Sequence, residues 1–241
     1  MTAPAPIALI TGAGKRIGQH IARELAKAGW DIAGHYNSSE EGISKLAKEV
    51  EASGRQFVPI QSDLAHDQPV NAIVPTITAN LGAPSLLINN ASLFAKDEIA
   101  TLDSAQFDAH MAINLKAPLM LAKAFAENIK GKGNIINITD QRVFNPGPDF
   151  FTYTLSKTGL DTATKTLAQA LAPSIRVNAI APGPVLQSIH QSPQEFEAEC
   201  QATPLGHGTS LDEIVKAVHF ILETPSMTGE TIHLDGGQRL S

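Results

Sequence analysis

The sequence predicts an α/β fold in which helices cover both faces of a doubly wound, seven-stranded parallel sheet. Short apolar runs alternate with segments of helical periodicity along all 241 residues, as in chains of βαβ units. The first apolar run leads into a glycine-rich turn at Thr11–Gly18, and neither a repeat nor a linker breaks the alternation. These observations also predict that residues 1–241 form a single domain.

Each element is predicted from the spacing of its apolar residues. Strands that are buried on both faces are continuous apolar runs, whereas helices repeat apolar residues every three or four positions. Ile7–Ile10 is such a run, and helical spacing then continues from Ile17 to Gly29. The same criteria predict strands at 6–11, 30–36, 56–61, 85–89, 133–139, 175–180 and 231–234. They predict helices at 17–28, 40–53, 68–80, 105–129, 153–171 and 211–222.

The segment at about 182–210 breaks this alternation. It contains several prolines and scattered polar residues. Loops of this length in compact domains usually act as lids or contain short helices of their own. We therefore predict a substrate lid at about 182–210.

Composition limits the possible functions. Acidic residues outnumber basic ones by 24 to 18, which gives a net charge of −6 and argues against binding to nucleic acid or to a membrane surface. Cys200 is the single cysteine, so the chain can form neither an internal disulfide nor a cysteine-based zinc site, and no metal is predicted. Residues 1–6 lack the features of a signal peptide, and no apolar run is long enough to span a bilayer. We therefore expect a cytoplasmic protein.

Thr11–Gly18 has the composition of a phosphate-binding turn between a strand and a helix. Gly12, Gly14 and Gly18 allow a tight turn and let backbone N–H groups approach a pyrophosphate at the helix N-terminus. A purely structural turn is the alternative. The position after the first strand of an alternating chain favours a dinucleotide site.

The tip of the second strand indicates which dinucleotide binds. An NAD site would place an acidic residue there. The tip is His35–Ser38, that is His35, Tyr36, Asn37 and Ser38, which has no carboxylate, and Asp31 lies at the opposite end of that strand. Because Lys15 and Arg16 add positive charge nearby, we predict NADPH, although both cations are also explained as solvated loop residues.

Tyr153 and Lys157 form a candidate catalytic pair. They are four residues apart and therefore share one face of the helix predicted at 153–171. A neighbouring ammonium group favours the phenolate, so we expect Lys157 to lower the pKa of Tyr153 toward a range useful for proton transfer.

With these motifs in order, the sequence resembles the short-chain dehydrogenase/reductase family along nearly its whole length. The resemblance implies a Rossmann-fold domain, a homotetramer, and a proton-transferring Tyr153 whose pKa Lys157 lowers while it holds the nicotinamide ribose. It also implies that Asn114 supports a water in a proton relay. The matching segments are Thr11–Gly18, Asp63-Leu64, Asn89-Asn90-Ala91, Asn114, Tyr153 with Lys157, Arg176-Val177-Asn178, Pro182-Gly183, Pro204-Leu205-Gly206 and Asp235-Gly236-Gly237. The NADPH-binding residues implied are Gly12, Gly14, Lys15, Arg16, Ile17, Gly18, Tyr36, Asn37, Ser38, Asp63, Leu64, Asn90, Ala91, Ser92, Thr139, Lys157, Pro182 and Gly183.

Two positions depart from the family pattern. The family usually has glycine where this chain has Arg16, and a catalytic serine where this chain has Asp140, thirteen residues before Tyr153. Thr139 is adjacent, but its side chain should point to the opposite face if the strand continues. A carboxyl group only accepts hydrogen bonds when ionised and can donate one when protonated. Asp140 therefore takes part in proton delivery, recognises N–H groups of a substrate, or is structural.

Both departures, together with the segment Asn89–Phe94, resemble pteridine reductases and the related bacterial dihydromonapterin reductases. This resemblance implies that Arg16 lies near the cofactor phosphates and the pterin, and that Ser92 contacts the cofactor. It also implies that Phe94 stacks the pterin against the nicotinamide, although Phe94 could instead fill the core. The substrate-binding residues implied are Arg16, Ser92, Phe94, Asp140 and Tyr153.

The resulting hypothesis is an NADPH-dependent reductase of a small molecule, a pterin or a related C=N or C=O compound. Dihydropterin, dihydrofolate and dihydromonapterin are substrates of this kind. The predicted catalytic residues are Tyr153, Lys157, Asp140 and Asn114. Two alternatives remain open, a carbonyl reductase or alcohol dehydrogenase acting for example on a 3-oxoacyl thioester, and a sensor that binds NADP(H) without turnover.

Overall fold

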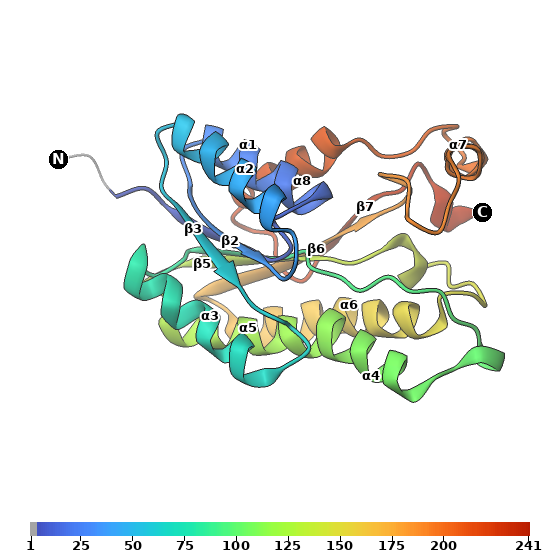
Figure 1. The fold of residues 1–241 in the computed structure, drawn as a ribbon, viewed down its shortest axis with the longest axis horizontal. Helices are drawn as coiled ribbons and strands as arrows, with labels where there is room; N and C mark the ends of the chain where they lie inside the picture. Colours follow the sequence, from blue (N-terminus) through green and yellow to red (C-terminus); the bar gives the residue numbers. More distant parts are fainter. Residues whose placement is uncertain (1–3) are drawn as a thin grey trace.

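Seven parallel strands form one sheet in the computed structural model, which describes residues 4–241. The strands are β1 (Ile7–Ile10), β2 (Asp31–Tyr36), β3 (Phe57–Gln61), β4 (Leu86–Asn89), β5 (Gly133–Ile138), β6 (Ile175–Pro182) and β7 (Thr231–Leu234). Their order is β3-β2-β1-β4-β5-β6-β7, and each neighbouring pair is parallel. The order runs outward in both directions from the β1–β4 pair, which confirms the doubly wound sheet (Figure 1).

Helices cover both faces of this sheet, as predicted (Figure 1). One face carries α1 (Arg16–Lys27), α2 (Glu40–Ala52) and α8 (Leu211–Glu223), and the other carries α3 (Asp67–Asn80), α4 (Ser104–Met111), α5 (Ala117–Asn128) and α6 (Phe151–Leu171). Successive residues of a strand point to opposite faces, so Ile10 packs in the core beneath α1, α2 and α8, whereas Leu9 packs in the core beneath α3, α5 and α6. Burial on both faces explains why the central strands are continuous apolar runs.

The helix predicted at 105–129 is one continuous helical segment with an irregular middle. Between α4 and α5 lies a π-helical turn, η2 (Ala112–Lys116). Such turns are rare and frequently mark functional sites. Here the turn contains Asn114, whose side chain is fully buried.

The segment predicted as a lid contains a helix, α7 (Pro193–Ala202), which apolar spacing did not reveal. Its start nevertheless has a local signal. Ser192 Oγ accepts the N–H of Glu195, the Glu195 carboxylate accepts the N–H of Ser192, and Pro193 occupies the first turn. A capping box of this kind can locate a helix that is too polar to show a clear apolar period.

All the predicted strands and helices are present, with ends that differ by a few residues. None of the helices in residues 4–241 combines the length and the hydropathy needed to cross a bilayer. The signal-peptide prediction concerns residues 1–6, of which residues 1–3 lie outside the described part of the chain.

Candidate active site

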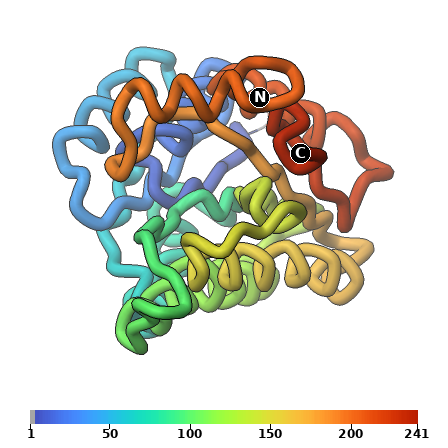
Figure 2. The backbone as a smooth tube through the Cα atoms, turned by 90° about the vertical axis from the view of Figure 1, so that its right-hand side faces the viewer, coloured from blue at the N-terminus to red at the C-terminus, as the bar shows by residue number. Residues whose placement is uncertain are grey.

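The candidate site lies at the carboxyl edge of the sheet, where β1 and β4 are neighbours and their connections leave in opposite directions. Open α/β sheets bind ligands at such a switch point. The loop after β1 contains the glycine-rich turn, the loop after β4 contains Ser92 and Phe94, and β5 leads into Asp140. Figure 2 looks onto this edge, with α7 in orange above it and α4 to α6 in green and yellow below.

Hydrogen bonds from neighbouring strands hold the glycine-rich turn in shape. Gly12 has a φ of 67°, which glycine adopts readily, and its N–H donates to Nδ1 of His35 at 3.2 Å. Thr11 Oγ1 accepts the N–H groups of Asn90 at 2.9 Å and of Ala91 at 3.0 Å. The turn is therefore fixed from β2 on one side and from the end of β4 on the other.

The glycines of the turn occupy space that no side chain could share. A Cβ on Gly18 would lie 2.4 Å from the carbonyl oxygen of Gly12, and a Cβ on Gly14 would lie 2.7 Å from Cβ of Ser39. A Cβ on Gly42, in the first turn of α2, would lie 1.9 Å from the carbonyl oxygen of Gly14. This close packing lets the N-terminus of α1 face a pyrophosphate. Ser39 and Gly42 were not among the residues predicted for this site.

The tip of β2 fits a dinucleotide that carries an additional phosphate. No carboxylate is present at Tyr36–Ser38, and Lys15 is exposed on the adjacent turn. Burial lowers the pKa of His35, so its neutral ring accepts from Gly12 and donates through Nε2 to the carbonyl oxygen of Ser62 at 3.0 Å. The chain thus offers backbone amides for a pyrophosphate and the Lys15 cation for a 2′-phosphate, with the acidic Glu40 and Glu41 following in the first turn of α2.

Arg16 joins the phosphate turn to the predicted lid. Its φ of 55° lies in the left-handed region, which is strained for a residue with a side chain. Its guanidinium donates to the carbonyl oxygens of Gln187 at 2.8 Å and Leu186 at 3.0 Å. A sequence pattern cannot reveal this contact, because the partners are about 170 residues away.

Tyr153, Asp140 and Lys157 meet between β5 and α6. The Tyr153 hydroxyl donates to Oδ2 of Asp140 at 2.7 Å, and Nζ of Lys157 donates to the carbonyl oxygen of Ile138 at 2.7 Å. Oδ1 of Asp140 accepts the N–H of Arg142 at 2.9 Å and so caps the short turn η3 (Gln141–Val143). Three of the four predicted catalytic residues are therefore in one buried cluster.

Burial and the Asp140 charge set the pKa values in this cluster. Burial raises the pKa of Asp140 and lowers the pKa of Lys157 to about 8. Burial and the neighbouring Asp140 also raise the pKa of Tyr153 well above its usual value. The expected lowering by Lys157 is wrong for this arrangement, because Nζ lies 5.8 Å from the ring centroid of Tyr153 while Asp140 contacts the hydroxyl directly. Tyr153 is consequently a protonated phenol near neutral pH.

Asn114 holds the loop after β4. Its Oδ1 accepts the N–H of Leu93 at 2.8 Å, and its Nδ2 donates to the carbonyl oxygen of Leu93 at 2.9 Å and to Oγ of Ser156 at 3.0 Å. Ser92 Oγ also donates to Oδ1 of Asn114, at 3.3 Å. The Asn114 side chain therefore positions Ser92 and its neighbours, and the predicted water relay remains a prediction.

Phe94 lies against the catalytic tyrosine. Its ring stacks on Phe150 with centroids 4.3 Å apart and planes 4° apart, and it meets the Tyr153 ring edge-on at 4.7 Å. Phe150 precedes α6 with a φ of 50°, a strained conformation for a bulky residue. Exposed His190, in the predicted lid, lies with Nε2 3.2 Å from the carbonyl oxygen of Phe94. Phe150 is an addition that sequence reasoning could not select from its aromatic neighbours.

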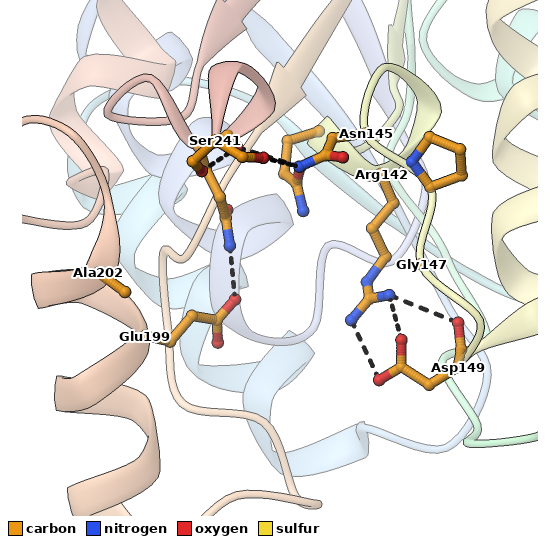
Figure 3. A pocket seen from close by; sticks show the side chains of 10 residues that line it. Arg142, Asn145, Gly147, Asp149, Glu199, Ala202 and Ser241 are labelled. Carbon is orange, nitrogen blue, oxygen red and sulfur yellow. Dashed lines mark hydrogen bonds and ion pairs between the residues drawn. The ribbon is translucent and has the colours of Figure 1, made fainter.

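A pocket of about 330 Å³ lies beside Arg142, and Figure 3 shows the residues that line it. It lies between η3, α7 and the turn η4 (Gln238–Leu240). Arg142 links it to the stack, because its guanidinium carbon lies 4.9 Å from the centroid of Phe150. The lining residues are Gln141, Arg142, Asn145, Pro146, Gly147, Asp149, Glu199, Ala202, Gln238 and Ser241.

The pocket walls contain two carboxylates, of Asp149 and Glu199, and one guanidinium, of Arg142. Arg142 Nη1 is paired with Asp149 at 2.7 Å, and the carboxylate of Glu199 accepts from Nε2 of Gln238 at 3.2 Å (Figure 3). Oε1 of Gln141 is buried and has no hydrogen-bond partner among the described residues. Two carboxylates around one guanidinium favour a ligand group with N–H or O–H donors over an anionic group.

The other predicted residues lie around the same edge. Asp63 accepts the N–H of Ala65 in its own loop, while Thr139 and Gly183 donate to backbone carbonyl oxygens of β6 and β7. Leu64 is part of one core, and Ile17 packs against the other. Within residues 4–241, no three His, Cys, Asp or Glu side chains gather in a way that could hold a metal ion.

The fold and site together define a class of protein, an oxidoreductase of the dinucleotide-binding type with a tyrosine–lysine pair. Residues 6–198 match the family described as short chain dehydrogenase. The chain belongs to this family, and the resemblance noted in the sequence is confirmed.

Two solved structures are similar along the whole chain. FolM alternative dihydrofolate reductase 1 from Brucella suis, in complex with NADP, is 43% identical with a TM-score of 0.95, and the match covers 100% of this chain and 97% of that one. Its counterpart from Brucella canis, complexed with NADP, is 42% identical with a TM-score of 0.92 and coverages of 98% and 95%. Among curated relatives, 3-oxoacyl-[acyl-carrier-protein] reductase FabG from Staphylococcus aureus is 30% identical, over 95% of this chain and 96% of that protein.

Proposed function

We propose that the chain is an NADPH-dependent reductase of a pterin-type substrate. The observation that carries the proposal is the bond between the Tyr153 hydroxyl and Asp140, at the position where the resemblance implies a serine for the family in general. The similarity to two FolM dihydrofolate reductases bound to NADP supports both the substrate class and the cofactor.

The residues that would hold the cofactor lie at the carboxyl edge of the sheet, in the glycine-rich turn and at the tip of β2. Backbone N–H groups at Gly14–Gly18 would bind its pyrophosphate, and Lys15 with the uncharged tip of β2 would bind its 2′-phosphate. When bound, NADPH supplies the hydride for reduction of a ring C=N bond. The protein contributes orientation, exclusion of water and a proton.

Tyr153 is the group that would deliver this proton. Its raised pKa keeps the hydroxyl protonated until the substrate nitrogen becomes basic during reduction. Asp140 accepts the bond from this hydroxyl at 2.7 Å, so its carboxyl group would orient the hydroxyl for the transfer. Lys157, whose Nζ is bonded to the carbonyl oxygen of Ile138, would hold the nicotinamide ribose, the other role that the resemblance implies.

The substrate ring would lie beside Phe94. The stack with Phe150 fixes the orientation of the Phe94 ring. The substituent of the substrate would extend into the pocket next to Arg142. Because Asp149 already neutralises Arg142 and Glu199 adds a further carboxylate, the walls favour a hydroxylated substituent over one that ends in carboxylates.

The test measures oxidation of NADPH by the purified chain with dihydropterins that carry hydroxylated or glutamylated substituents. We expect turnover with dihydropterins and faster turnover with the hydroxylated ones. Tyr153→Phe should lower the rate by about 10²- to 10⁴-fold, while NADPH binding, followed by its fluorescence, stays unchanged. Turnover of 3-oxoacyl thioesters or ketones but not of dihydropterins would replace the pterin proposal with a ketoreductase. Equal behaviour of the wild type and Tyr153→Phe would support a sensor.

The homotetramer and the cytoplasmic location remain predictions. Light scattering of the purified chain measures its mass directly, and cell fractionation with an antibody against the chain locates it.

A further inference from the structure

A buried polar cluster joins the loop that carries Phe94 to the helix that carries Tyr153. Its members are Asp97, in the loop after β4, His110 on α4, and Thr152 in the first turn of α6. Their exposed fractions are 4%, 0% and 0%. The proton chemistry described above uses none of them, although burying three polar side chains is costly unless they bond to one another.

Asp97 supplies the N-terminal cap of α6. The residue before the helix, Phe150, has no side chain that can accept a hydrogen bond, and none caps the helix from that position. The N–H of Thr152 instead donates to both carboxylate oxygens of Asp97 at 3.2 Å, and the Thr152 hydroxyl donates to Oδ2 at 2.5 Å. The N–H of Phe151 donates to the carbonyl oxygen of Asp97 at 3.4 Å. The helix turn that contains Tyr153 is thus tied to the neighbouring loop.

His110 continues the cluster back to the loop, and the donors fix its tautomer. The N–H of Ala95, next to Phe94, can only donate, so Nε2 of His110 accepts from it at 3.4 Å. A neutral ring then carries its proton on Nδ1 and donates to the Thr152 hydroxyl oxygen at 2.7 Å, which leaves the hydroxyl proton for Asp97. Burial lowers the pKa of His110, which agrees with the neutral ring.

The cluster therefore bonds to the two segments that carry the groups of the site, the loop with Phe94 and the first turn of α6 with Tyr153. On one side it holds Ala95 and Asp97, within three residues of Phe94, and on the other it holds the residue before Tyr153. The His110 and Tyr153 rings also lie edge to face, with centroids 6.3 Å apart. A small displacement in the cluster would move Phe94 and the Tyr153 hydroxyl relative to each other.

We propose that Thr152, with Asp97 and His110, is a positioning residue that sets the distance between the Phe94 ring and the Tyr153 hydroxyl. The inference rests on the proposed function only in the choice of a dihydropterin as substrate. The phosphate turn is built from other residues, so the cluster acts on the substrate and not on the cofactor.

The test replaces Thr152 by valine, which has the same shape and lacks the hydroxyl. We expect kcat/KM for the dihydropterin to fall by about 10- to 100-fold, because displacements below 1 Å of reacting groups have effects of this size, with an unchanged Kd for NADPH. Thr152→Ser keeps the hydroxyl and should restore most of the activity. The matched control is Thr154→Val on the same helix. The Thr154 hydroxyl is buried without a partner among the described residues, so its loss should leave kcat/KM unchanged.

A second variant keeps the test informative if Thr152→Val does not fold. In His110→Asn the amide nitrogen can still donate to Thr152, but the bond to Ala95 is lost. It should raise KM by about tenfold and change kcat less. Equal losses in Thr152→Val and Thr154→Val, or no rescue by serine, would overturn the inference. A wild type that reduces only ketones would refute the pterin proposal instead, and the same variants would then be compared with that ketone.

Discussion

The loop after β1 and the loop after β4 both leave the same edge of the sheet, yet they are held in different ways. The glycine-rich loop after β1 is shaped by close backbone packing at Gly12 and Gly18, together with the bonds that His35 and Thr11 make on either side of it. The loop after β4 is shaped by side chains that reach it from distant elements, namely Asn114, His110 and Thr152. The rigid backbone of the first loop suits a cofactor of constant shape. The side chains that hold the second loop can be replaced, so that loop can be adapted to different substrates.

The two regions also differ in buried charge. On the cofactor side, the buried polar side chain that holds the turn is His35, whose lowered pKa keeps it neutral. The substrate side contains the buried groups Asp140, Tyr153 and Lys157, each with a shifted pKa. Groups with shifted pKa values make stability depend on pH. The alkaline part of this dependence should include Lys157 and Tyr153 on the substrate side, whereas the cofactor-side His35 contributes only at acidic pH, below its usual pKa of 6.5.

The largest effect we expect concerns Lys157. Burial lowers its pKa from 10.5 to about 8, so between these two values the unfolded chain binds more protons than the folded chain. The free energy of unfolding should therefore rise with pH across this window, by roughly 3 kcal/mol in total. Below pH 8 the full penalty of burying the ammonium group is present.

The measurement is urea unfolding of the wild type and of Lys157→Met at pH 7.5 and at pH 10. Wild-type stability should increase relative to the variant as the pH rises. Lys123→Met removes a lysine whose side chain is 66% exposed and serves as the control, with no comparable change. A difference between wild type and Lys157→Met that stays constant with pH would contradict the assignment of buried charge to the substrate side.

The second prediction concerns the cofactor side and its dependence on close backbone contact. In Gly18→Ala the new methyl group would lie 2.4 Å from the carbonyl oxygen of Gly12 and 2.5 Å from Nδ2 of Asn90. Overpacking of this kind costs about 1–3 kcal/mol and should move the turn away from the shape that binds pyrophosphate. We expect the Kd for NADPH to rise by about 10-fold or more, measured by fluorescence titration.

Gly54→Asn is the control for this variant. Gly54 also has a positive φ, of 73°, but no atom lies within 4 Å of the position of a Cβ there, and asparagine tolerates this conformation. The control should bind NADPH normally. If Gly18→Ala also binds normally, the turn adapts and the contrast between the two loops is smaller than the packing indicates.

The same contrast explains how much could be predicted from the sequence. The alternation of apolar runs and the glycines at Gly12, Gly14 and Gly18 are local features, and local features determine the sheet and its phosphate turn. Tyr153 and Lys157 are also local, because one helix turn separates them. The bond between Tyr153 and Asp140 spans thirteen residues and was not predicted. Asp140 became a candidate through a family resemblance and not through an apolar period.

The remaining parts of the site depend on contacts between distant residues. Asp97 and Thr152 are 55 residues apart, and His110 is 42 residues from Thr152, in stretches without a recognisable motif. The pKa of Tyr153 was expected to be lowered, because the sequence places Lys157 one turn away but does not show that its Nζ is bonded to Ile138. Only α7 had a local signal that was overlooked, the capping box that begins at Ser192.

The smallest effect we expect tests Arg16, which links the two sides. Its side chain holds the predicted lid through the carbonyl oxygens of Leu186 and Gln187, while its backbone has the positive φ that a glycine adopts without strain. Both Arg16→Ala and Arg16→Gly lose the contacts to the lid, but only glycine also relieves the strain. Arg16→Gly should therefore be more stable than Arg16→Ala by about 1 kcal/mol, or about 2–4 °C in Tm.

Limited proteolysis separates the two contributions. Both variants should be cleaved faster than the wild type near residues 186–190, because both have lost the guanidinium that holds this segment. Calorimetry should rank Arg16→Gly above Arg16→Ala. If alanine is the more stable of the two, the positive φ is not strained, and the position needs an explanation other than a compromise between backbone and lid. If the variants are cleaved no faster than the wild type, the lid is held by contacts other than those of Arg16, and Arg16 is left free to serve the cofactor side as the resemblance implied.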